Sequence, residues 1–322
     1  HSYTAFFMPL NTADEKFMLG IFLFSLRKWQ ISDIILPIMS NNVKKALIWA
    51  IESLKGGGIE NPQLDAEVLL AYVLDTDRTQ LYLYPETILD EEKSLYYKIL
   101  TWKRQSHIPV SYLTGHKEFM SLDFKVNESV LVPRPETEIL VEAVIKSSAS
   151  HSKIFDLGTG SGAIAISLAK YIPDCLVLAT DLSLEALMIA RENAVINGVN
   201  DKILFGQTDL FDAILPNFGF DYIVSNPPYI PTDDIKNLSD EVRKFEPTMA
   251  IDGGIDGLDI IRKILGNAFV LLKPSGRLAI EIGYGQSDEV QRIAEETEKY
   301  SDYAIIEDYS RIPRVFYCRA KI

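Results

Sequence analysis

The feature that most constrains the fold is an alternation of strand-like and helix-like segments that begins at Lys153 and continues to the end of the chain. Such alternation is typical of βαβ units, in which helices connect parallel strands and cover the sheet. The last two strand-like segments, 303–309 and 314–322, have no helix between them. We expect them to pair as a hairpin, which makes one edge of the sheet antiparallel. The pattern therefore predicts an α/β fold with a doubly wound, mostly parallel, seven-stranded sheet.

The chain before this region has a different pattern and indicates a second, smaller domain. Residues 41–115 contain several stretches with apolar side chains at helical spacing, separated by glycine and proline residues. The next stretch alternates and is rich in residues that favour strands. We expect an all-helical domain over 41–115, a β-hairpin linker over 116–132 and the α/β domain over 133–322.

Residues 1–40 fit neither domain. They contain an apolar run from Phe17 to Leu26, which is much shorter than the roughly 20 residues that span a membrane. The acidic Asp14 and Glu15 lie just before this run, which is untypical of a secretory signal peptide. We therefore expect no membrane association, and we expect the native domain to begin near Met39 after an extension that does not belong to it.

The charge balance bears on the class of partner. The chain carries 45 acidic and 32 basic residues, a formal net charge of −13, of which −11 lies in 116–322 and −2 in 41–115. Proteins that grip DNA use basic groups against its phosphates, so this balance argues against a DNA partner. Two cysteines and four scattered histidines provide neither a disulfide framework nor metal-ligand spacing. We expect a cytoplasmic monomer without a metal ion.

The first chemical motif, DLGTGSG at 156–162, follows the first strand of the α/β domain. Its glycines let the backbone turn tightly and approach a ligand closely, because no Cβ atom stands between them. The helix that follows directs free N–H groups toward the same place. The loop also fits a dinucleotide fingerprint, and a strand-to-helix turn that binds nothing. It therefore indicates a nucleotide-type cofactor without identifying it.

Acidic residues end the next two strands. Asp181 can accept hydrogen bonds from both hydroxyl groups of a ribose, or it can cap the next helix, for which Ser183 competes. Asp209 can accept a hydrogen bond from an adenine amino group, and the neighbouring Leu210 can pack against the ring. Asp181 suits NAD and S-adenosylmethionine equally well, and Asp209 alone is a weak signal because an aspartate often ends a strand.

The most specific motif is Asn226-Pro227-Pro228-Tyr229, at the end of the fourth strand. Asn-Pro alone is a turn signal, but the carboxyl edge of a parallel sheet is where such folds bind ligands. Two prolines fix the backbone and leave carbonyl groups with no N–H beside them. The side-chain oxygen of Asn226 and the carbonyl of Pro227 then form a rigid pair of acceptors for one planar –NH2 group. Tyr229 offers a flat face on which this group can stack.

Together these motifs resemble the amino-directed class I S-adenosylmethionine-dependent methyltransferases, which have a Rossmann-like fold. Within that class the sequence is similar to the HemK-type peptide-chain release factor glutamine methyltransferases over about residues 41–322. The stretches that carry the resemblance are VPRPETEILVE (132–142), IFDLGTGSGAIAISLA (154–169), IVSNPPYI (223–230) and FEPTMAIDGGIDGLDIIRKI (245–264). Leu210 departs from the pattern, because the family often has an aromatic residue there.

The resemblance implies transfer of a methyl group from S-adenosylmethionine to the side-chain amide nitrogen (N5) of a glutamine, which leaves S-adenosylhomocysteine. That glutamine lies in the Gly-Gly-Gln loop of class-one release factors, which act in translation termination. The helical domain would recognise this protein substrate, although it could instead only stabilise the enzyme. The resemblance assigns Gly158, Thr159, Gly160, Ser161, Gly162, Asp181, Asp209, Leu210 and Asn226 to cofactor binding, Asn226, Pro227, Pro228 and Tyr229 to substrate binding, and Asn226, Pro227 and Tyr229 to catalysis.

The chemistry of an amide fits this site. An amide nitrogen is a poor nucleophile because its lone pair is delocalised into the carbonyl group. Acceptors that hold both N–H bonds would direct and localise this lone pair, and alignment of this kind can lower a barrier by about 7–11 kcal/mol.

Three alternatives remain open. A DNA adenine-N6 methyltransferase shares both motifs, but the acidic charge of 116–322 disfavours it. A nucleotide-dependent dehydrogenase shares the glycine loop but gives Asn226 to Tyr229 no role. A non-catalytic module would retain only the fold, whereas every motif position here is intact.

Overall fold

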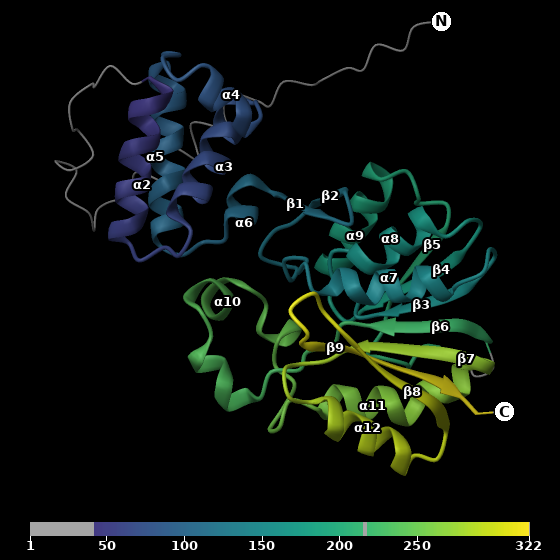
Figure 1. Cartoon of the computed structure of the whole chain (residues 1–322). Helices are drawn as coiled ribbons and strands as arrows, with labels where there is room; N and C mark the ends of the chain where they lie inside the picture. The colour runs from purple at the N-terminus through teal and green to yellow at the C-terminus, as the bar shows by residue number, and fades with distance from the viewer. Residues whose placement is uncertain (1–41, 215–217, 322) are drawn as a thin grey trace, which may run out of the picture.

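Residues 42–214 and 218–321 are described by a computed structural model, which has a helical lobe and an α/β lobe (Figure 1). The expected extension 1–40 lies outside the described residues. The helical lobe confirms the all-helical prediction for 41–115 over the part described. Its core is built from buried side chains such as Ala50, Leu54, Leu69 and Leu70. Its helices are α2 (Val43–Gly56), α3 (Pro62–Leu74), α4 (Arg78–Leu83), α5 (Glu91–Gln105) and α6 (Val110–Thr114).

A two-stranded hairpin joins the lobes, but it is shorter than the sequence indicates. Strands β1 (His116–Phe119) and β2 (Leu122–Lys125) pair antiparallel around a tight turn. From residue 126 the chain leaves the sheet, because Asn127 closes a turn with Ser129 and Val130, and two prolines follow. Proline has no N–H to continue a strand ladder. The stretch 126–136 instead becomes part of a cavity wall.

The main sheet confirms the expected seven strands. They lie in the order β5-β4-β3-β6-β7-β9-β8, and only β9 runs against the others. The pairing of β8 with β9 is the expected antiparallel hairpin at the edge. The bounds are β3 (Lys153–Leu157), β4 (Leu176–Asp181), β5 (Ile203–Gln207), β6 (Phe220–Ser225), β7 (Leu272–Glu281), β8 (Tyr300–Glu307) and β9 (Pro313–Ala320).

Helices cover both faces of this sheet (Figure 1). One face packs against α7 (Thr137–Ser147), α8 (Ala163–Tyr171) and α9 (Leu184–Ile196), and the other against α11 (Asp259–Asn267), the short η5 (Ala268–Leu271) and α12 (Ser287–Glu296). The order of strands reverses between β3 and β6, so these two strands flank the crevice where such sheets bind ligands.

The long connection between β6 and α11 forms elements that the sequence pattern does not predict, namely η3 (Thr232–Asn237), α10 (Asp240–Phe245) and η4 (Thr248–Ala250). Helix α10 contacts the helical lobe through a buried arginine. Arg104 of α5 pairs with Asp65 of α3 at 2.6 Å and also with Glu241 of α10. One guanidinium group therefore joins two helices of the lobe to the α/β domain.

Gly162 shows how α8 approaches α9 closely. It precedes α8 with a φ of +84°, and a Cβ atom there would lie 2.8 Å from Cδ1 of Ile166 and 3.2 Å from Cβ of Ala190. Gly198, after α9, has a similar φ of +68°, but no atom lies within 4 Å of the position that its Cβ would take. A side chain at Gly198 would meet backbone strain alone, whereas a side chain at Gly162 would meet the same strain and a steric clash.

We expect Gly198→Ala to lower the free energy of unfolding by about 1 kcal/mol, because alanine is strained at positive φ. Gly162→Ala should lower it by about 2–4 kcal/mol, because it adds a clash with α9 to the same strain. Denaturant unfolding of both variants measures the difference. Equal losses would show that the contact between α8 and α9 does not require this glycine.

Candidate active site

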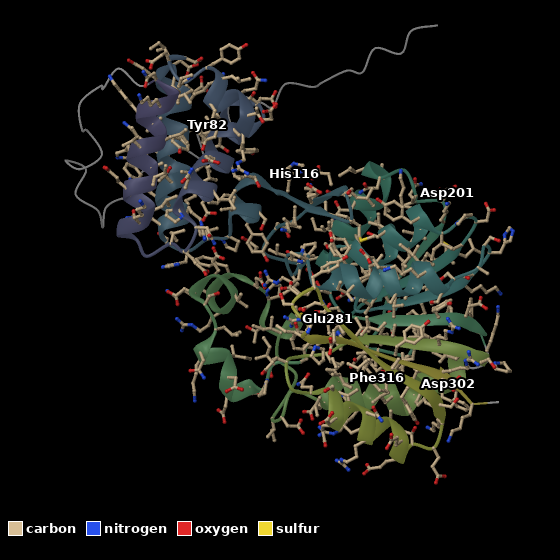
Figure 2. The ribbon with its side chains drawn as sticks, viewed as in Figure 1. Tyr82, His116, Asp201, Glu281, Asp302 and Phe316 are labelled. Carbon is tan, nitrogen blue, oxygen red and sulfur yellow. The ribbon has the colours of Figure 1, made fainter. Side chains whose placement is uncertain are left out.

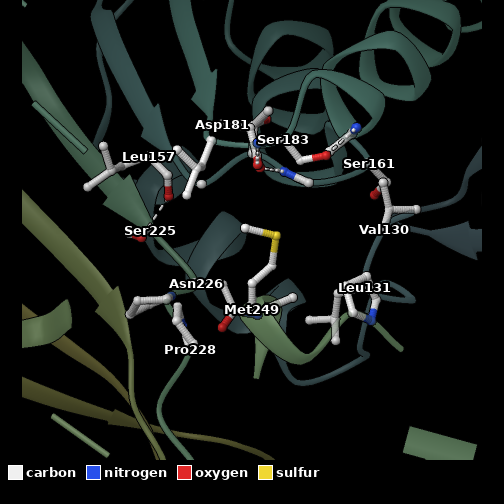
Figure 3. A pocket seen from close by; sticks show the side chains of 18 of the residues that line it. Val130, Leu131, Leu157, Ser161, Asp181, Ser183, Ser225, Asn226, Pro228 and Met249 are labelled. Carbon is white, nitrogen blue, oxygen red and sulfur yellow. Dashed lines mark hydrogen bonds between the residues drawn. The ribbon is translucent and has the colours of Figure 1, made fainter. Parts of the chain in front are cut away.

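A cavity of about 230 Å³ opens at the carboxyl ends of β3, β4, β5 and β6 (Figure 3). Its wall combines the segments that the sequence singled out with parts of the chain far from them. The lining residues are Ser129, Val130, Leu131, Pro133, Arg134, Thr137, Leu157, Gly158, Thr159, Gly160, Ser161, Ala163, Ile164, Thr180, Asp181, Leu182, Ser183, Ala186, Thr208, Asp209, Leu210, Ser225, Asn226, Pro227, Pro228, Pro247, Met249, Ala250 and Ile260.

The glycine loop after β3 presents bare backbone to this cavity. Gly158 and Gly160 have φ values of +73° and +55°, and no atom lies within 4 Å of the position a Cβ would take. The loop is held from behind, since the N–H groups of Gly158 and Thr159 donate to the carbonyl of Thr180 at 2.9 and 2.8 Å. Gly162 does not line the cavity. It packs against α9, and its predicted contact with a cofactor stays a prediction.

Asp156 anchors the loop from inside the protein. Its side chain is fully buried, and Oδ2 accepts hydrogen bonds from the hydroxyl of Thr159 at 2.6 Å and the N–H of Ala165 at 3.1 Å. Oδ1 has no partner among the described residues. Burial raises the pKa of Asp156 to about 7, since water no longer solvates the charge. The loop therefore depends on a carboxyl group that is costly to bury in its ionised form.

Asp181 lies at the end of β4 and faces the cavity (Figure 3). Oδ2 accepts from the N–H of Gly160 at 2.8 Å and Oδ1 from the N–H of Ser183 at 2.9 Å. Burial raises its pKa, although these backbone hydrogen bonds oppose the effect. Ser183 rather than Asp181 caps α9, because its hydroxyl accepts from the N–H of Ala186 at 3.1 Å. Asp181 therefore does not cap α9, which was the alternative role that the sequence allowed for it.

The adenine-side residues and the substrate-side residues also meet here. Asp209 and Leu210 lie at the β5 side of the cavity, with Leu210 half-buried against the core. Asn226 and Pro228 lie on the opposite side from Ser161, and Met249 reaches between them (Figure 3). Pro227 lines the cavity beside Asn226.

The side chain of Asn226 is held in one orientation. Its amide nitrogen Nδ2 donates to the hydroxyl oxygen of Thr137 at 3.1 Å, and within 42–214 and 218–321 no hydrogen bond to Oδ1 is seen. Ser225, one residue earlier, donates to the carbonyl of Leu157 at 2.7 Å and ties the end of β6 to the glycine loop. The glycine loop after β3 and the asparagine motif after β6 are therefore joined through these adjacent strands.

Tyr229 does not line the cavity. Its hydroxyl donates to Oε1 of the buried Glu281 at 3.3 Å, and its carbonyl accepts from Nε2 of Gln286 at 2.9 Å (the region around Glu281 is marked in Figure 2). Gly257 lies so close that a Cβ there would be 2.4 Å from the carbonyl of Tyr229. These contacts hold Tyr229 behind the motif, and its predicted stacking on the substrate amide stays a prediction.

Several residues of the wall lie in stretches that carry the resemblance but receive no role from the sequence. Thr137 lies within a stretch that the resemblance covers, yet only the fold brings it to Asn226. Arg134 donates to both carboxylate oxygens of the buried Glu246 at 2.7 and 2.6 Å, which neutralises its charge at the cavity. Met249 enters from the unpredicted connection after β6. The fold brings these residues to the cavity, and no local sequence pattern predicts that they meet there.

Two kinds of feature are absent from the ranges 42–214 and 218–321. Within them, no group of three or more His, Cys, Asp or Glu side chains is arranged to hold a metal ion. No helix in the same ranges has the length and apolar character that a membrane crossing requires.

Comparison with known proteins gives consistent matches across both lobes. Residues 45–115 match the PrmC N-terminal domain family, and residues 135–242 match the methyltransferase small domain family. A release factor glutamine methyltransferase from Moorella thermoacetica is 43% identical over 276 residues, covering 85% of this chain and 97% of its own. Another from Koribacter versatilis is 39% identical over 275 residues, covering 85% and 96%.

Among solved structures, the chain is similar to a release factor-specific protein-(glutamine-N5) methyltransferase from Alicyclobacillus acidocaldarius. The identity is 28%, the coverage is 62% of this chain and 100% of that one, and the TM-score is 0.37. The two sequence relatives carry the assignment, because they match almost their entire length at about 40% identity. On that similarity, and with the lobes and motifs it spans, this chain belongs to the release factor glutamine methyltransferase family.

Proposed function

We propose that this protein transfers a methyl group from S-adenosylmethionine to the side-chain amide nitrogen of the glutamine in the Gly-Gly-Gln loop of a class-one release factor. The observation that carries the proposal is that Asn226 lines the cavity with its amide nitrogen bonded to Thr137, which leaves its oxygen to accept a hydrogen bond from a substrate.

The residues at the cavity fit this cofactor. Gly158 and Gly160 leave open space where side chains would otherwise stand, which suits close contact with its methionine part. The carboxylate of Asp181 suits the ribose hydroxyl groups, and Asp209 with Leu210 suits the adenine. When bound, S-adenosylmethionine supplies an electrophilic methyl group.

The chain itself supplies orientation. Asn226 and Pro227 line one wall of the cavity, and we propose that Asn226 Oδ1 and the carbonyl of Pro227 together hold both N–H bonds of a glutamine amide. A nitrogen held in this way directs its lone pair along one line, and this alignment lowers the entropy cost of the reaction. Arg134 is paired with Glu246, so its guanidinium adds little positive field to the lining.

A protein substrate suits the charge of this chain better than DNA. The segment 116–322 carries a net charge of −11, which repels phosphate groups. The helical lobe exposes apolar and aromatic side chains, of which Tyr82, Leu83 and Tyr84 at α4 are each about 60% exposed. Exposed patches of this kind often contact protein partners. We propose that this lobe holds the release factor.

Two substitutions should separate the two halves of the site. Asn226→Ala should lower kcat for release factor methylation by about a hundredfold or more, because one acceptor for the amide is lost. Its Kd for S-adenosylmethionine should stay within about tenfold of the wild type. Asp181→Asn should instead raise the Kd for S-adenosylmethionine about tenfold or more, while kcat for release factor methylation changes little.

Transfer of a radiolabelled methyl group to a release factor measures kcat, and calorimetry measures the Kd. Duplex DNA in place of the release factor tests the alternative substrate. Methylation of DNA but not of the release factor would contradict the proposed function, and an active Asn226→Ala variant would contradict the role of the acceptor pair.

The helical lobe gives an independent prediction. Leu83→Ser combined with Tyr84→Ser should raise KM for the release factor about tenfold, because buried apolar contact area is lost from the complex. The Kd for S-adenosylmethionine should not change. Tyr309→Ser is the control, since Tyr309 is 89% exposed but lies between β8 and β9. A double variant with wild-type KM would show that this surface does not hold the substrate.

A further inference from the structure

A buried carboxyl group behind Asn226 has no role in the chemistry described so far. Glu281 is the last residue of β7 and is 1% exposed. Oε1 accepts from the hydroxyl of Tyr229, whereas Oε2 has no hydrogen bond of good geometry among the described residues. The hydroxyl of Thr137 lies close enough to stabilise the charged carboxylate. A buried carboxyl that is only partly satisfied lowers stability, so its presence calls for a functional reason.

The groups around Glu281 leave its charge poorly compensated. Burial raises its pKa to about 7, and the negative charge of Glu136, just before α7, acts in the same direction. Tyr229 and Thr137 oppose this by hydrogen bonding. Arg314 on β9 also favours the charged form, but its guanidinium is already paired with Asp308 at 2.9 Å. The carboxyl can therefore exchange a proton near neutral pH.

The charged state of Glu281 determines the direction of the hydrogen bonds that lead to Asn226. An ionised carboxylate only accepts hydrogen bonds, whereas a threonine hydroxyl has one hydrogen to donate and lone pairs that accept. A charged Glu281 attracts the hydroxyl hydrogen of Thr137, which contributes to stabilising that charge. With its hydrogen directed that way, Thr137 can only accept from Asn226, which is the direction of the 3.1 Å contact from Asn226 Nδ2. The oxygen of Asn226 is then left for the substrate.

Protonation of Glu281 removes this constraint. The neutral carboxyl can donate to Thr137, and the hydroxyl hydrogen of Thr137 can then turn to Asn226 and bond its oxygen instead. An amide turned in this way presents N–H groups to the substrate –NH2 group, which also donates. Two donors cannot bond each other, so the acceptor pair at the cavity is broken.

We propose that Glu281 is a positioning residue, whose ionised carboxylate acts through Thr137 to hold the amide of Asn226 with its oxygen toward the substrate. This inference rests on the proposed function and adds to it a pH-dependent control of the same site. Activity should fall as the pH drops through the pKa of this carboxyl, because the folded enzyme then loses the correct amide orientation.

The kinetic test compares Glu281→Gln with the wild type between about pH 5.5 and about pH 8.5. Wild-type kcat for release factor methylation should fall on the acid side with a midpoint at about 7. Glu281→Gln should be about 10- to 100-fold slower at about pH 8 and should lack this acid limb, because its amide does not titrate and can donate to Thr137. Its Kd for S-adenosylmethionine should stay within about threefold.

Matched variants separate positioning from stability. Thr137→Val should show the same loss of kcat, and Thr137→Ser should recover most of it, because serine restores the hydroxyl group. Glu307→Gln, on the exposed end of β8, controls for removal of a negative charge. Thermal unfolding of each variant checks that the enzyme is folded. A Glu281→Gln enzyme with wild-type kcat and an unchanged acid limb would overturn the proposal.

A second readout does not need activity. The side-chain N–H signals of Asn226 in ¹⁵N-labelled protein, identified by their loss in Asn226→Ala, should shift with a midpoint at a pH of about 7 in the wild type and not in Glu281→Gln. A shift without release factor methylation would leave the positioning role intact and refute the proposed function. Methylation without a shift, or with the same shift in Glu281→Gln, would refute the positioning role and leave the function intact.

Discussion

The hydrogen bond from the amide of Asn226 to the hydroxyl of Thr137 joins two segments that are distant in sequence, the end of β6 and the start of α7. An asparagine amide can turn over and exchange donor for acceptor. The hydroxyl of Thr137 removes this freedom only while its own hydrogen is directed elsewhere, because it then can only accept from Asn226. The chemistry proposed for the cavity depends on the outcome, because only the oxygen of Asn226 can receive an N–H bond from a substrate amide. The buried carboxyl of Glu281 gives this choice of orientation a physical cause.

The rest of the site follows from the reversal of strand order between β3 and β6. This arrangement brings the glycine loop and the asparagine motif to adjacent strand ends, and the 2.7 Å hydrogen bond from Ser225 to Leu157 fixes them to each other. Asp181 holds the loop from the next strand through the N–H of Gly160. A rigid frame of this kind positions cofactor and substrate groups with little loss of conformational entropy on binding. The connection with α10 then links the frame to the helical lobe through Arg104.

The sequence predicts the strands, helices and motifs well, but it predicts poorly which side chains pack behind the motifs. Alternating apolar segments were sufficient for the seven strands, their antiparallel edge and the helical lobe, because periodicity is a local property. The motifs also predict which strand ends meet. Gly162 packs against α9 and Tyr229 bonds Glu281, and no local pattern predicts these contacts because they join segments far apart in the sequence. Thr137 and Met249 were missed for the same reason, and the hairpin is shorter because turn and proline residues after Lys125 override strand propensity.

The central claim is that a release factor glutamine receives the methyl group. Peptide mass spectrometry of a purified class-one release factor, after incubation with this enzyme and S-adenosylmethionine, tests it most directly. The account predicts a mass gain of one methyl group on the glutamine of the Gly-Gly-Gln loop, and no gain with Asn226→Ala. An unmodified Gly-Gly-Gln peptide after incubation with folded, cofactor-binding enzyme, or a methyl group on another residue, would contradict it.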